Sequence, residues 1–280
     1  MAIHDLSGFG KCSLSIALPV LSAAGLETVS LPTAVLSTHT GGFQGYTYRD
    51  LTEDILPMAE HWHQLGLTFN ALYSGFLGSL EQISMVSSIF DRFKTEDNLI
   101  VVDPAMADFG RYYRTVSPEM GREMSALCRR ADIVIPNMTE AAFLVGEEYR
   151  QGPYSMEYIQ HLLEELSRIG PKKIVLTGVM PNPDEIGAAY YDCESGETAF
   201  FLADVVPGQY HGTGDLFASA FLGALLYPHS PGKSLRIAVN LVTSSIRRTY
   251  EAKTDVRYGV NFEEGLFAYL TELRSAESSQ

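Results

Sequence analysis

The sequence predicts an α/β fold in which a mostly parallel central sheet is covered by helices on both faces. Short apolar segments rich in Val, Ile and Leu alternate along the chain with longer segments of helical periodicity, which is the pattern of repeated strand–helix units. An alternation of strands and helices indicates a mostly parallel sheet that is covered on both faces. Polar, glycine-containing stretches follow most of them, where open α/β sheets bind their ligands.

The first part of the chain is predicted to contain four strands and three helices. The predicted strands are a short one around Ile3 and segments 28–36, 70–73 and 99–102. The predicted helices are an apolar stretch that ends at Gly25, with Pro19 in its first turn or at a kink, and segments 50–67 and 81–93. A polar glycine loop, residues 5–13, joins the first strand to the first helix.

The second part of the chain continues the alternation. Helices are predicted at 118–130, 154–169, 234–250 and 262–273, and strands at 132–135 and 173–176. Segments 186–191 and 197–202 are predicted to form a hairpin with Ser195 and Gly196 at its turn. Because no linker or change of composition divides the chain, we expect one domain over residues 1–280.

Composition excludes several classes of function. The 280 residues carry a net charge of −14, which argues against nucleic acid or an anionic membrane as the main partner. The three cysteines, Cys12, Cys128 and Cys193, are widely spaced and indicate a reduced, cytoplasmic chain without a disulfide framework or zinc site. No basic segment followed by an apolar one opens the sequence, and no run of 18 apolar residues occurs, so neither a signal peptide nor a membrane span is expected.

The stretch YHGTGDLFASAFLGALL, residues 210–226, carries the strongest chemical signal. Gly212, Thr213 and Gly214 form a glycine-rich turn before an apolar helix, and such a turn directs backbone N–H groups and the positive end of the helix dipole at an anion. If that anion is a phosphate chain, Asp215 could take the proton from an attacking hydroxyl. The alternative is that Asp215 only caps the helix.

Other polar loops are predicted to lie at the same edge of the sheet, because each follows a strand. These loops are residues 5–13, 37–46, 74–76, 103–108, 137–140, 177–179 and 212–215. They can therefore converge on one crevice although they span the sequence. GFGKCS in the first loop looks like a phosphate-binding P-loop, but Asp5 and Cys12 stand where that motif needs glycine and Ser or Thr.

These motifs together resemble a known superfamily. HGTGDLFASAFLGALL resembles the signature of the ribokinase-like superfamily, whose members phosphorylate a hydroxyl group with ATP. LSTHTGG, YSGFLGS, DPAMAD, IPNMTEA and GTGDLFASA occur in the order expected of pyridoxal kinases, and DLSGFGKCS is similar to the first loop of the vitamin-kinase branch. The resemblance covers nearly the whole chain. It implies a ribokinase-like fold and transfer of the γ-phosphoryl of MgATP to the hydroxymethyl group of a B6 vitamer.

The resemblance also implies roles for the residues around the phosphates. Asp215 would be the catalytic base, and the N–H groups of residues 212–214 would hold the charge that develops on the γ-phosphate. Asp103, Asp108 and Glu140 match positions that help to hold Mg²⁺ and a monovalent cation, K⁺ or Na⁺, directly or through water. The alternative for Asp103 is an acid at a strand end before proline.

Four further positions match the nucleotide site of the family. Asn137 and Thr177 match positions near the ATP phosphates, with an Asx turn and a strand-end hydroxyl as the alternatives. Val179 and Tyr210 are candidate apolar walls for adenine, and ordinary core packing is the alternative for both.

The acceptor site is expected to draw on Asp5 and Ser7 from the first loop, and on Thr40 and Phe76, which match positions facing a pyridine ring. Phe76 could stack on that ring and stands where many relatives have tyrosine. His39 contacts substrate or shapes its loop. No role is predicted for Lys11 or Cys12.

Two alternative functions stay open at this point. The first loop carries Asp5 and Ser7 where pyridoxal kinases usually have serine and histidine. In this respect it resembles the hydroxymethylpyrimidine kinases of thiamine synthesis, which are the first alternative. A non-catalytic vitamin-binding protein on the same fold is the third possibility. The resemblance implies a homodimer.

Overall fold

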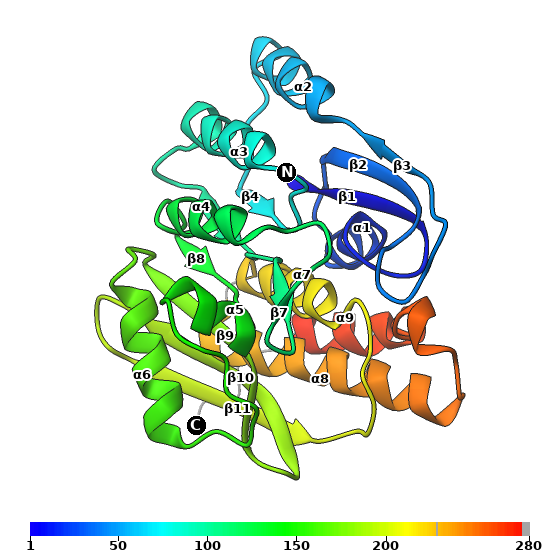
Figure 1. Ribbon diagram of the computed structural model, residues 1–280, viewed down its shortest axis with the longest axis vertical. Helices are drawn as coiled ribbons and strands as arrows, with labels where there is room; N and C mark the ends of the chain where they lie inside the picture. Colours follow the sequence, from blue (N-terminus) through cyan, green and yellow to red (C-terminus); the bar gives the residue numbers. More distant parts are fainter. Residues whose placement is uncertain (228, 276–280) are drawn as a thin grey trace.

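The computed structural model describes residues 1–227 and 229–275 and contains a nine-stranded sheet with helices on both faces (Figure 1). The strand order is β11-β10-β9-β8-β5-β4-β1-β2-β3. The strands from β9 to β2 pair in parallel, whereas β10, β11 and β3 pair antiparallel at the two edges. The predicted fold class is therefore confirmed. The strands of this sheet are β1 (Ala2–Phe9), β2 (Ser30–Thr38), β3 (Tyr48–Asp50), β4 (Ala71–Ser74), β5 (Leu99–Val102), β8 (Ile133–Val134), β9 (Lys173–Asn182), β10 (Glu185–Asp192) and β11 (Thr198–Asp204).

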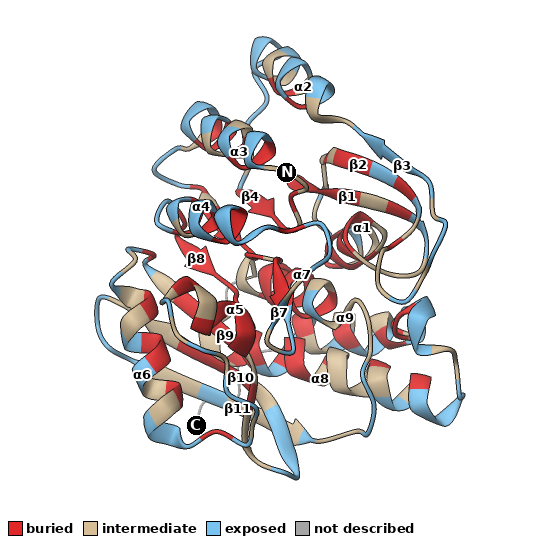
Figure 2. Cartoon of the chain, viewed as in Figure 1, coloured by how far each residue is buried: buried red, intermediate tan, exposed pale blue. Residues whose placement is uncertain are grey.

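The helices form two layers, one on each face of the sheet, and each layer has its own apolar core. Figure 2 shows the buried residues on the central strands and on the inner sides of the helices. One core packs the sheet against α2 (Thr52–Gln64), α3 (Leu80–Phe93), α4 (Pro118–Cys128), α5 (Met138–Leu144) and α6 (Met156–Ser167). The other packs it against α1 (Leu14–Ala23), α7 (Thr213–Leu225), α8 (Pro231–Glu251) and α9 (Leu266–Arg274).

Side-chain caps fix where several helices begin. Ser79, Ser117 and Ser155 each accept a hydrogen bond from the backbone N–H three residues later, at the starts of α3, α4 and α6. Asn137 caps α5 in the same way and forms a capping box with Glu140. Such caps satisfy N–H groups that have no partner within the helix.

The strand–helix prediction was wrong in detail around the ligand loops. Asp5 and Ser7 belong to β1, not to a loop, and residues 177–179 belong to β9. Their polar side chains and glycines interrupt the apolar pattern by which strands are recognised. The short elements α5 and β3, and the separate hairpin of β6 (Ala107–Asp108) and β7 (Arg111–Tyr112), were not predicted.

Two short 3-10 helices, η1 (Val256–Tyr258) and η2 (Glu263–Gly265), lie between α8 and α9. Across the described ranges, no helix is both long enough and apolar enough to cross a membrane.

Candidate active site

A cavity of about 770 Å³ lies at the carboxyl ends of the parallel strands, where ligands bind in open α/β sheets. Nearly all of the predicted site residues line it, although they come from loops far apart in the sequence. Those at the cavity are Asp5, His39, Thr40, Phe76, Asp103, Asp108, Asn137, Glu140, Thr177, Tyr210, Gly212, Thr213, Gly214 and Asp215. The two predicted residues that do not line it are Ser7 and Val179.

The glycine-rich turn opens α7 directly into this cavity. Gly212 is the residue before the helix and has φ 77°, a left-handed conformation that suits glycine. A Cβ at Gly212 would lie 2.1 Å from the carbonyl oxygen of Lys11, whereas a Cβ at Gly214 would meet no atom within 4 Å. The turn is thus closely packed against Lys11 at Gly212, whereas the space beside Gly214 is open. Its free N–H groups and the helix dipole form an anion site.

Asp215 lies in the first turn of α7 but does not cap the helix. Its Oδ2 accepts a hydrogen bond from the backbone N–H of Ser13 at 2.8 Å, and its side chain is 16% exposed. The pKa of Asp215 is raised to about 7, mainly by burial and also by the charge on Asp5, although the Ser13 N–H opposes the shift. A carboxyl group with a pKa near neutrality is suited to accept a proton at physiological pH.

A buried polar cluster lies behind Asp215. The Nδ1 atom of His4 is 4.0 Å from Asp215 Oδ1, and the His4 side chain is fully buried. Burial lowers the pKa of His4 to about 3, so the imidazole is neutral. Its ring packs edge-on against Tyr73 at 4.4 Å, and the polar atoms of His4, Tyr73 and Ser219 have no hydrogen-bond partner in the described structure. No sequence pattern indicates this cluster.

Asp5 is held by two hydroxyl groups at the same cavity. The hydroxyl of Ser13 donates to Asp5 Oδ1 at 2.6 Å, and the hydroxyl of Ser7 donates to Oδ2 at 3.3 Å. Burial raises the pKa of Asp5, while these two hydroxyl groups lower it. The prediction that Ser7 faces the acceptor needs correction. Since residues 5 and 7 share one face of the strand, Ser7 is buried behind Asp5 and contacts that carboxylate instead of the cavity.

The loop after β2 supplies the next wall of the cavity. His39 Nδ1 accepts from the N–H of Gly41 at 3.1 Å, and Nε2 lies 2.6 Å from the carbonyl oxygen of Arg257. The neutral tautomer protonated at Nε2 satisfies both contacts, and burial lowers the pKa of His39 accordingly. His39 therefore shapes the loop, while Thr40 beside it is half-buried at the cavity. His211 also lines the cavity, 5.0 Å from the ring of His39.

His211 was missed by the sequence analysis, although it directly precedes the recognised Gly212. Phe76, at the exit of β4, is half-buried on the same cavity. The residues predicted for the acceptor site and His211 thus bring one aromatic ring, two imidazoles, a hydroxyl and the Asp5 carboxylate to the cavity.

Three acids also line the cavity. Asp103 follows β5, is 7% exposed, and accepts no hydrogen bond from any described residue. Burial raises the pKa of Asp103 well above its usual range, and the charges on Glu140 and Asp215 add to the effect. Burial also raises the pKa of Glu140 to about 8, although three backbone N–H groups oppose it. Asp108 is exposed, and its Oδ1 accepts from the N–H of Phe109.

This acidic cluster suits a hydrated cation better than a cage of protein ligands. Glu140 uses Oε1 for the N–H of Met106 at 3.0 Å and Oε2 for the N–H of Asn137 at 2.9 Å. In the described ranges, no three acidic, histidine or cysteine side chains are arranged to hold a metal by themselves. Mg²⁺ commonly keeps several waters and binds one or two carboxylates together with substrate phosphates. Asp103, with both oxygens free and no cation beside it, fits that requirement.

Asn137 and Thr177 adjoin each other on neighbouring strand ends. The Oδ1 atom of Asn137 accepts from the N–H groups of Thr139 and Glu140, and its Nδ2 donates to the carbonyl of Ala107 at 2.9 Å. Asn137 therefore forms the Asx turn that was its alternative and also caps α5, at the border of the cavity. The Thr177 hydroxyl makes one long contact, 3.4 Å, with the carbonyl of Pro136.

A bulge in β9 decides which of its residues face the cavity. Thr177 pairs with Ala188 of β10 and Val179 pairs with Gly187, so Gly178, with φ 72°, is the extra residue. Bulges re-aim side chains and are common near active sites. Val179 is consequently fully buried in the core, and its prediction as an adenine wall was wrong.

The apolar wall is formed by other residues, which the sequence analysis did not identify. They are Met180, Ile186, Val206, Val242 and Ile246, from β9, β10, the segment after β11 and α8. Tyr210 lines the same region, with its hydroxyl donating to the carbonyl of Pro207 at 2.6 Å.

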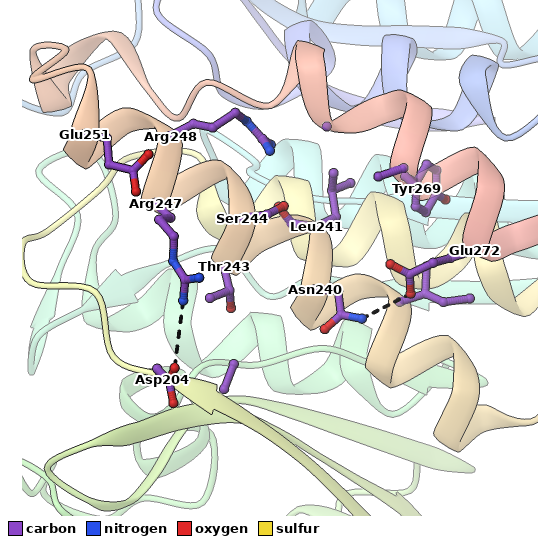
Figure 3. Close-up of a pocket in the computed structure, with 14 residues that line it drawn as sticks. Asp204, Asn240, Leu241, Thr243, Ser244, Arg247, Arg248, Glu251, Tyr269 and Glu272 are labelled. Carbon is purple, nitrogen blue, oxygen red and sulfur yellow. Dashed lines mark hydrogen bonds and ion pairs between the residues drawn. The ribbon is translucent and has the colours of Figure 1, made fainter.

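A second cavity, of about 530 Å³, lies between α8, α9 and the end of β11 (Figure 3). Its polar side chains contact one another: Arg247 pairs with Asp204 at 3.9 Å, and Asn240 donates to Glu272 at 3.1 Å. None of the predicted site residues lines it. The larger cavity is therefore the candidate active site.

Comparison with known proteins identifies the family of the chain. Residues 17–259 match the model of the phosphomethylpyrimidine kinase family. A Bacteroides thetaiotaomicron protein carrying that family's name, crystallised with pyridoxal, is 35% identical, with a TM-score of 0.91 over 96% of this chain and 94% of its own.

Two relatives are named as pyridoxal kinases. The enzyme of Lactobacillus plantarum is 32% identical, with a TM-score of 0.87 over 96% of this chain and 95% of its own. Pyridoxal kinase PdxY of Rubrobacter xylanophilus is 26% identical over 261 residues, 90% of this chain and 86% of its own. The chain belongs to the phosphomethylpyrimidine kinase family and is a ribokinase-like phosphotransferase that acts on an alcohol group.

Proposed function

We propose that this protein transfers the γ-phosphoryl group of ATP to the hydroxymethyl group of a B6 vitamer, forming the 5′-phosphate. The observation that carries the proposal is the position of Asp215 in the cavity. Its carboxylate accepts a hydrogen bond from Ser13, in the loop between β1 and α1. It also belongs to the same helical turn as the anion site of Gly212–Gly214. A hydroxyl group bound beside Asp5 and a phosphate bound at the turn would meet at this carboxylate.

The chemistry follows from that position. Asp215 takes the proton of the hydroxymethyl group while the hydroxyl oxygen attacks the γ-phosphorus. An O–P bond forms, the bond from the γ-phosphorus to the bridging oxygen breaks, and ADP leaves with its electron pair. The N–H groups of the turn stabilise charge on the transferred group. Asp215 then releases its proton to solvent.

The three acids of the cavity are the candidates for binding the metal. Mg²⁺, when bound with ATP, neutralises phosphate charge and aligns the phosphates for transfer. Asp103 is the residue we assign to hold it, with Glu140 and Asp108 acting through water. A monovalent cation, K⁺ or Na⁺, would be accommodated in the same acidic region.

The two halves of the cavity fit the two substrates. Phe76 and Thr40 would take a pyridine ring by stacking and hydrogen bonding, and the apolar wall of β9, β10 and α8 would take adenine. The 35% identical Bacteroides protein that was crystallised with pyridoxal supports the choice of acceptor.

We further propose that residues 1–280 act as one kinase unit, because a single nine-stranded sheet carries all of these loops. The family resemblance supports a homodimer in the cytoplasm. Light scattering coupled to size-exclusion chromatography measures the assembly directly, and a monomeric mass at micromolar concentration would contradict the dimer.

The function is tested by measuring kcat/KM with MgATP on pyridoxal, pyridoxine, pyridoxamine and hydroxymethylpyrimidine. ADP release and the phosphorylated product are measured together, and a reaction without acceptor is the control. We expect at least one B6 vitamer to exceed hydroxymethylpyrimidine. Preference for the pyrimidine would overturn the acceptor assignment, and binding of a vitamer without turnover would indicate a non-catalytic vitamin-binding protein.

A further inference from the structure

The loop between β1 and α1, residues 10–13, makes the hydrogen bond that orients Asp215. The N–H of Ser13 reaches Asp215 Oδ2 at 2.8 Å. Ser13 has φ 53°, a conformation that is unfavourable for residues other than glycine and persists only where the surroundings hold it. The direction of this N–H therefore depends on what fixes the loop.

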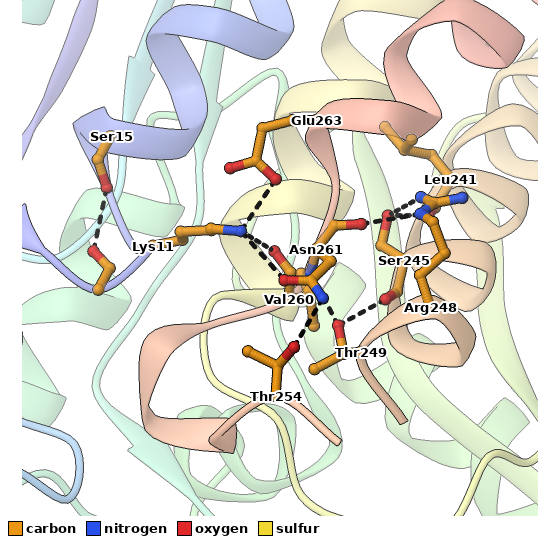
Figure 4. A network of polar contacts seen from close by, with 11 residues as sticks. Lys11, Ser15, Leu241, Ser245, Arg248, Thr249, Thr254, Val260, Asn261 and Glu263 are labelled. Atoms are coloured by element: carbon orange, nitrogen blue, oxygen red, sulfur yellow. Dashed lines mark hydrogen bonds and ion pairs between the residues drawn. The ribbon is translucent and has the colours of Figure 1, made fainter. Parts of the chain in front are cut away.

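The loop is fixed from outside by Lys11, a residue to which neither the motifs nor the cavity assigns a role. Figure 4 shows the Lys11 side chain directed at the segment of residues 254–263. Its ammonium group donates to the carbonyl of Val260 at 3.1 Å, to Asn261 Oδ1 at 3.4 Å and to Glu263 Oε2 at 2.9 Å. The backbone N–H of Lys11 also donates to the carbonyl of Tyr258 at 3.1 Å.

The 254–263 segment is itself attached to α8, so it can serve as an anchor. The N–H of Asn261 donates to Thr249 Oγ1 of α8 at 2.7 Å, and within the segment Asn261 Nδ2 donates to Thr254 Oγ1 at 2.9 Å. Arg248 Nε donates to the carbonyl of Asn261 at 2.9 Å. These bonds, drawn in Figure 4, connect the long helix α8 to Lys11 through residue 261.

Lys11 also adjoins the catalytic turn through its backbone. A Cβ added to Gly212 would lie 2.1 Å from the carbonyl oxygen of Lys11, and one added to Gly259 would lie 2.8 Å from the same oxygen. The loop is thus packed between the turn of α7 and the 254–263 segment. Lys11 does not line the cavity, and its charge is not among the causes that shift the pKa of Asp215. Any effect of Lys11 on the reaction must therefore pass through the loop.

We propose that Lys11 is a positioning residue that fastens the 10–13 loop to the 254–263 segment and thereby keeps the Ser13 N–H on the carboxylate of Asp215. The inference rests on the proposed function of Asp215 as the base. It also concerns parts of the chain that the family match does not reach, since the match covers residues 17–259 whereas Lys11 and its three side-chain acceptors lie outside that range.

The test compares Lys11→Met, which keeps the length and apolar stem, with Lys11→Arg, which keeps a cation and donors. The matched control is Lys172→Met. Lys172 also pairs with a carboxylate, that of Asp132, but it precedes β9 and therefore lies at the amino end of that strand, away from the cavity at the carboxyl ends. We expect Lys11→Met to lower kcat about tenfold, the scale for a slightly misplaced catalytic group. Both KM values should stay within about twofold, because Lys11 does not contact the cavity, and Lys11→Arg should restore most of the rate.

The pH profile separates positioning from simple loss of structure. The Ser13 N–H favours the ionised carboxylate, so its loss should move the acid limb of kcat to higher pH in Lys11→Met alone. Lys11 makes no hydrogen bond or ion pair with the other titratable groups around Asp215, so their contributions should not change. Those groups are His4 and Asp5 of β1, Cys12 of the loop, Tyr73 of β4, Asp103 after β5 and Tyr113 after β7.

Amide hydrogen exchange provides a readout that does not depend on catalysis. Lys11→Met should exchange faster than wild type over residues 10–13 and unchanged over α6. The inference would be overturned if Lys11→Met had the same kcat, acid limb and amide exchange as the wild type. An equal fall in kcat for Lys172→Met would overturn it as well. If the wild-type protein phosphorylates no acceptor, the proposed function fails. The exchange result alone then supports or overturns the role of Lys11 in fastening the 10–13 loop.

Should Lys11→Met not fold, Glu263→Gln gives a milder version of the test, because Glu263 is 56% exposed. In that variant Lys11 keeps its acceptors on Val260 and Asn261, while the amide oxygen of the glutamine can still accept a hydrogen bond but carries no charge. We expect a twofold to threefold fall in kcat (roughly, as for weakening one exposed ion pair) and a shift of the acid limb in the same direction. No change in either quantity would overturn the inference.

Discussion

At the acceptor end of the cavity the polar side chains are buried and bonded to the protein, whereas the apolar wall at the nucleotide end is spread over β9, β10 and α8. Asp5 is held by the Ser13 hydroxyl, and His39 is held between Gly41 and Arg257. Met180 and Ile186, by contrast, offer only apolar contact. The acceptor end is therefore preorganised for directional recognition, and we expect single substitutions to cost more there than at the nucleotide end.

The largest effect is expected at the junction of the two ends. Asp215→Asn keeps the size of the side chain and removes the base, so kcat should fall by about 10²–10⁴, the usual range for a lost general base. Binding of an unreactive ATP analogue and of pyridoxal, measured by calorimetry, should persist. Asp97→Asn, at an exposed position before β5, is the control. A kcat near that of the wild type would remove Asp215 from the mechanism.

Substitutions at the acceptor end should raise the KM of pyridoxal without changing that of ATP. Thr40→Val removes a hydroxyl and should cost about 1–3 kcal/mol if a polar group of the substrate is left without a partner. Phe76→Ala should cost about 1 kcal/mol by loss of stacking, and Phe76→Tyr should retain activity. Steady-state kinetics on both substrates measures these effects. A rise in the KM of ATP alone would mean that the two ends are assigned in reverse.

A change among the three acids of the cavity should affect the metal requirement. Asp103→Asn keeps the shape of the side chain and removes a carboxyl group whose pKa is raised by burial and by the charge on Glu140. We expect the Mg²⁺ concentration for half-maximal rate to rise about tenfold, as for loss of one charged ligand, with the KM of pyridoxal unchanged. An unaltered Mg²⁺ midpoint would show that Asp103 is structural.

The smallest effects are expected at the apolar wall. Val242→Ala and Ile246→Ala each remove methyl groups from a half-buried position on α8, which should cost about 1 kcal/mol of ATP affinity or less. The KM of pyridoxal should not change. Titration with an ATP analogue checks this, and a loss of pyridoxal affinity instead would place the vitamer against α8.

The difference between the two ends also explains which residues could be predicted. Asp103 and Thr40 at strand exits, and Asp215 at the start of α7, are visible in the sequence because polar side chains and glycines interrupt an apolar pattern there. Val242 and Ile246 carry no such signal, because an apolar helix residue that faces a ligand looks like one that faces the core.

The wrong predictions have physical causes of the same kind. Val179 was predicted at the adenine site, but the bulge at Gly178 changes which residues of β9 face the cavity, and a bulge depends on pairing with β10. The first strand was predicted too short because His4, Asp5 and Ser7 are polar, although all three are buried. The contact of Lys11 with residues about 250 positions away could not be predicted from local sequence.

The central claim, that Asp215 accepts the proton, is tested most directly by the pH dependence of the single-turnover rate. Burial raises the pKa of Asp215 to about 7, and the protonated carboxyl cannot act as a base. The rate of pyridoxal phosphorylation should therefore fall as pH decreases below about 7 and level off above it, with pyridoxal and ATP binding measured over the same range as a control. A rate that stays constant down to about pH 5, near the range of an ordinary aspartate, would contradict the assignment.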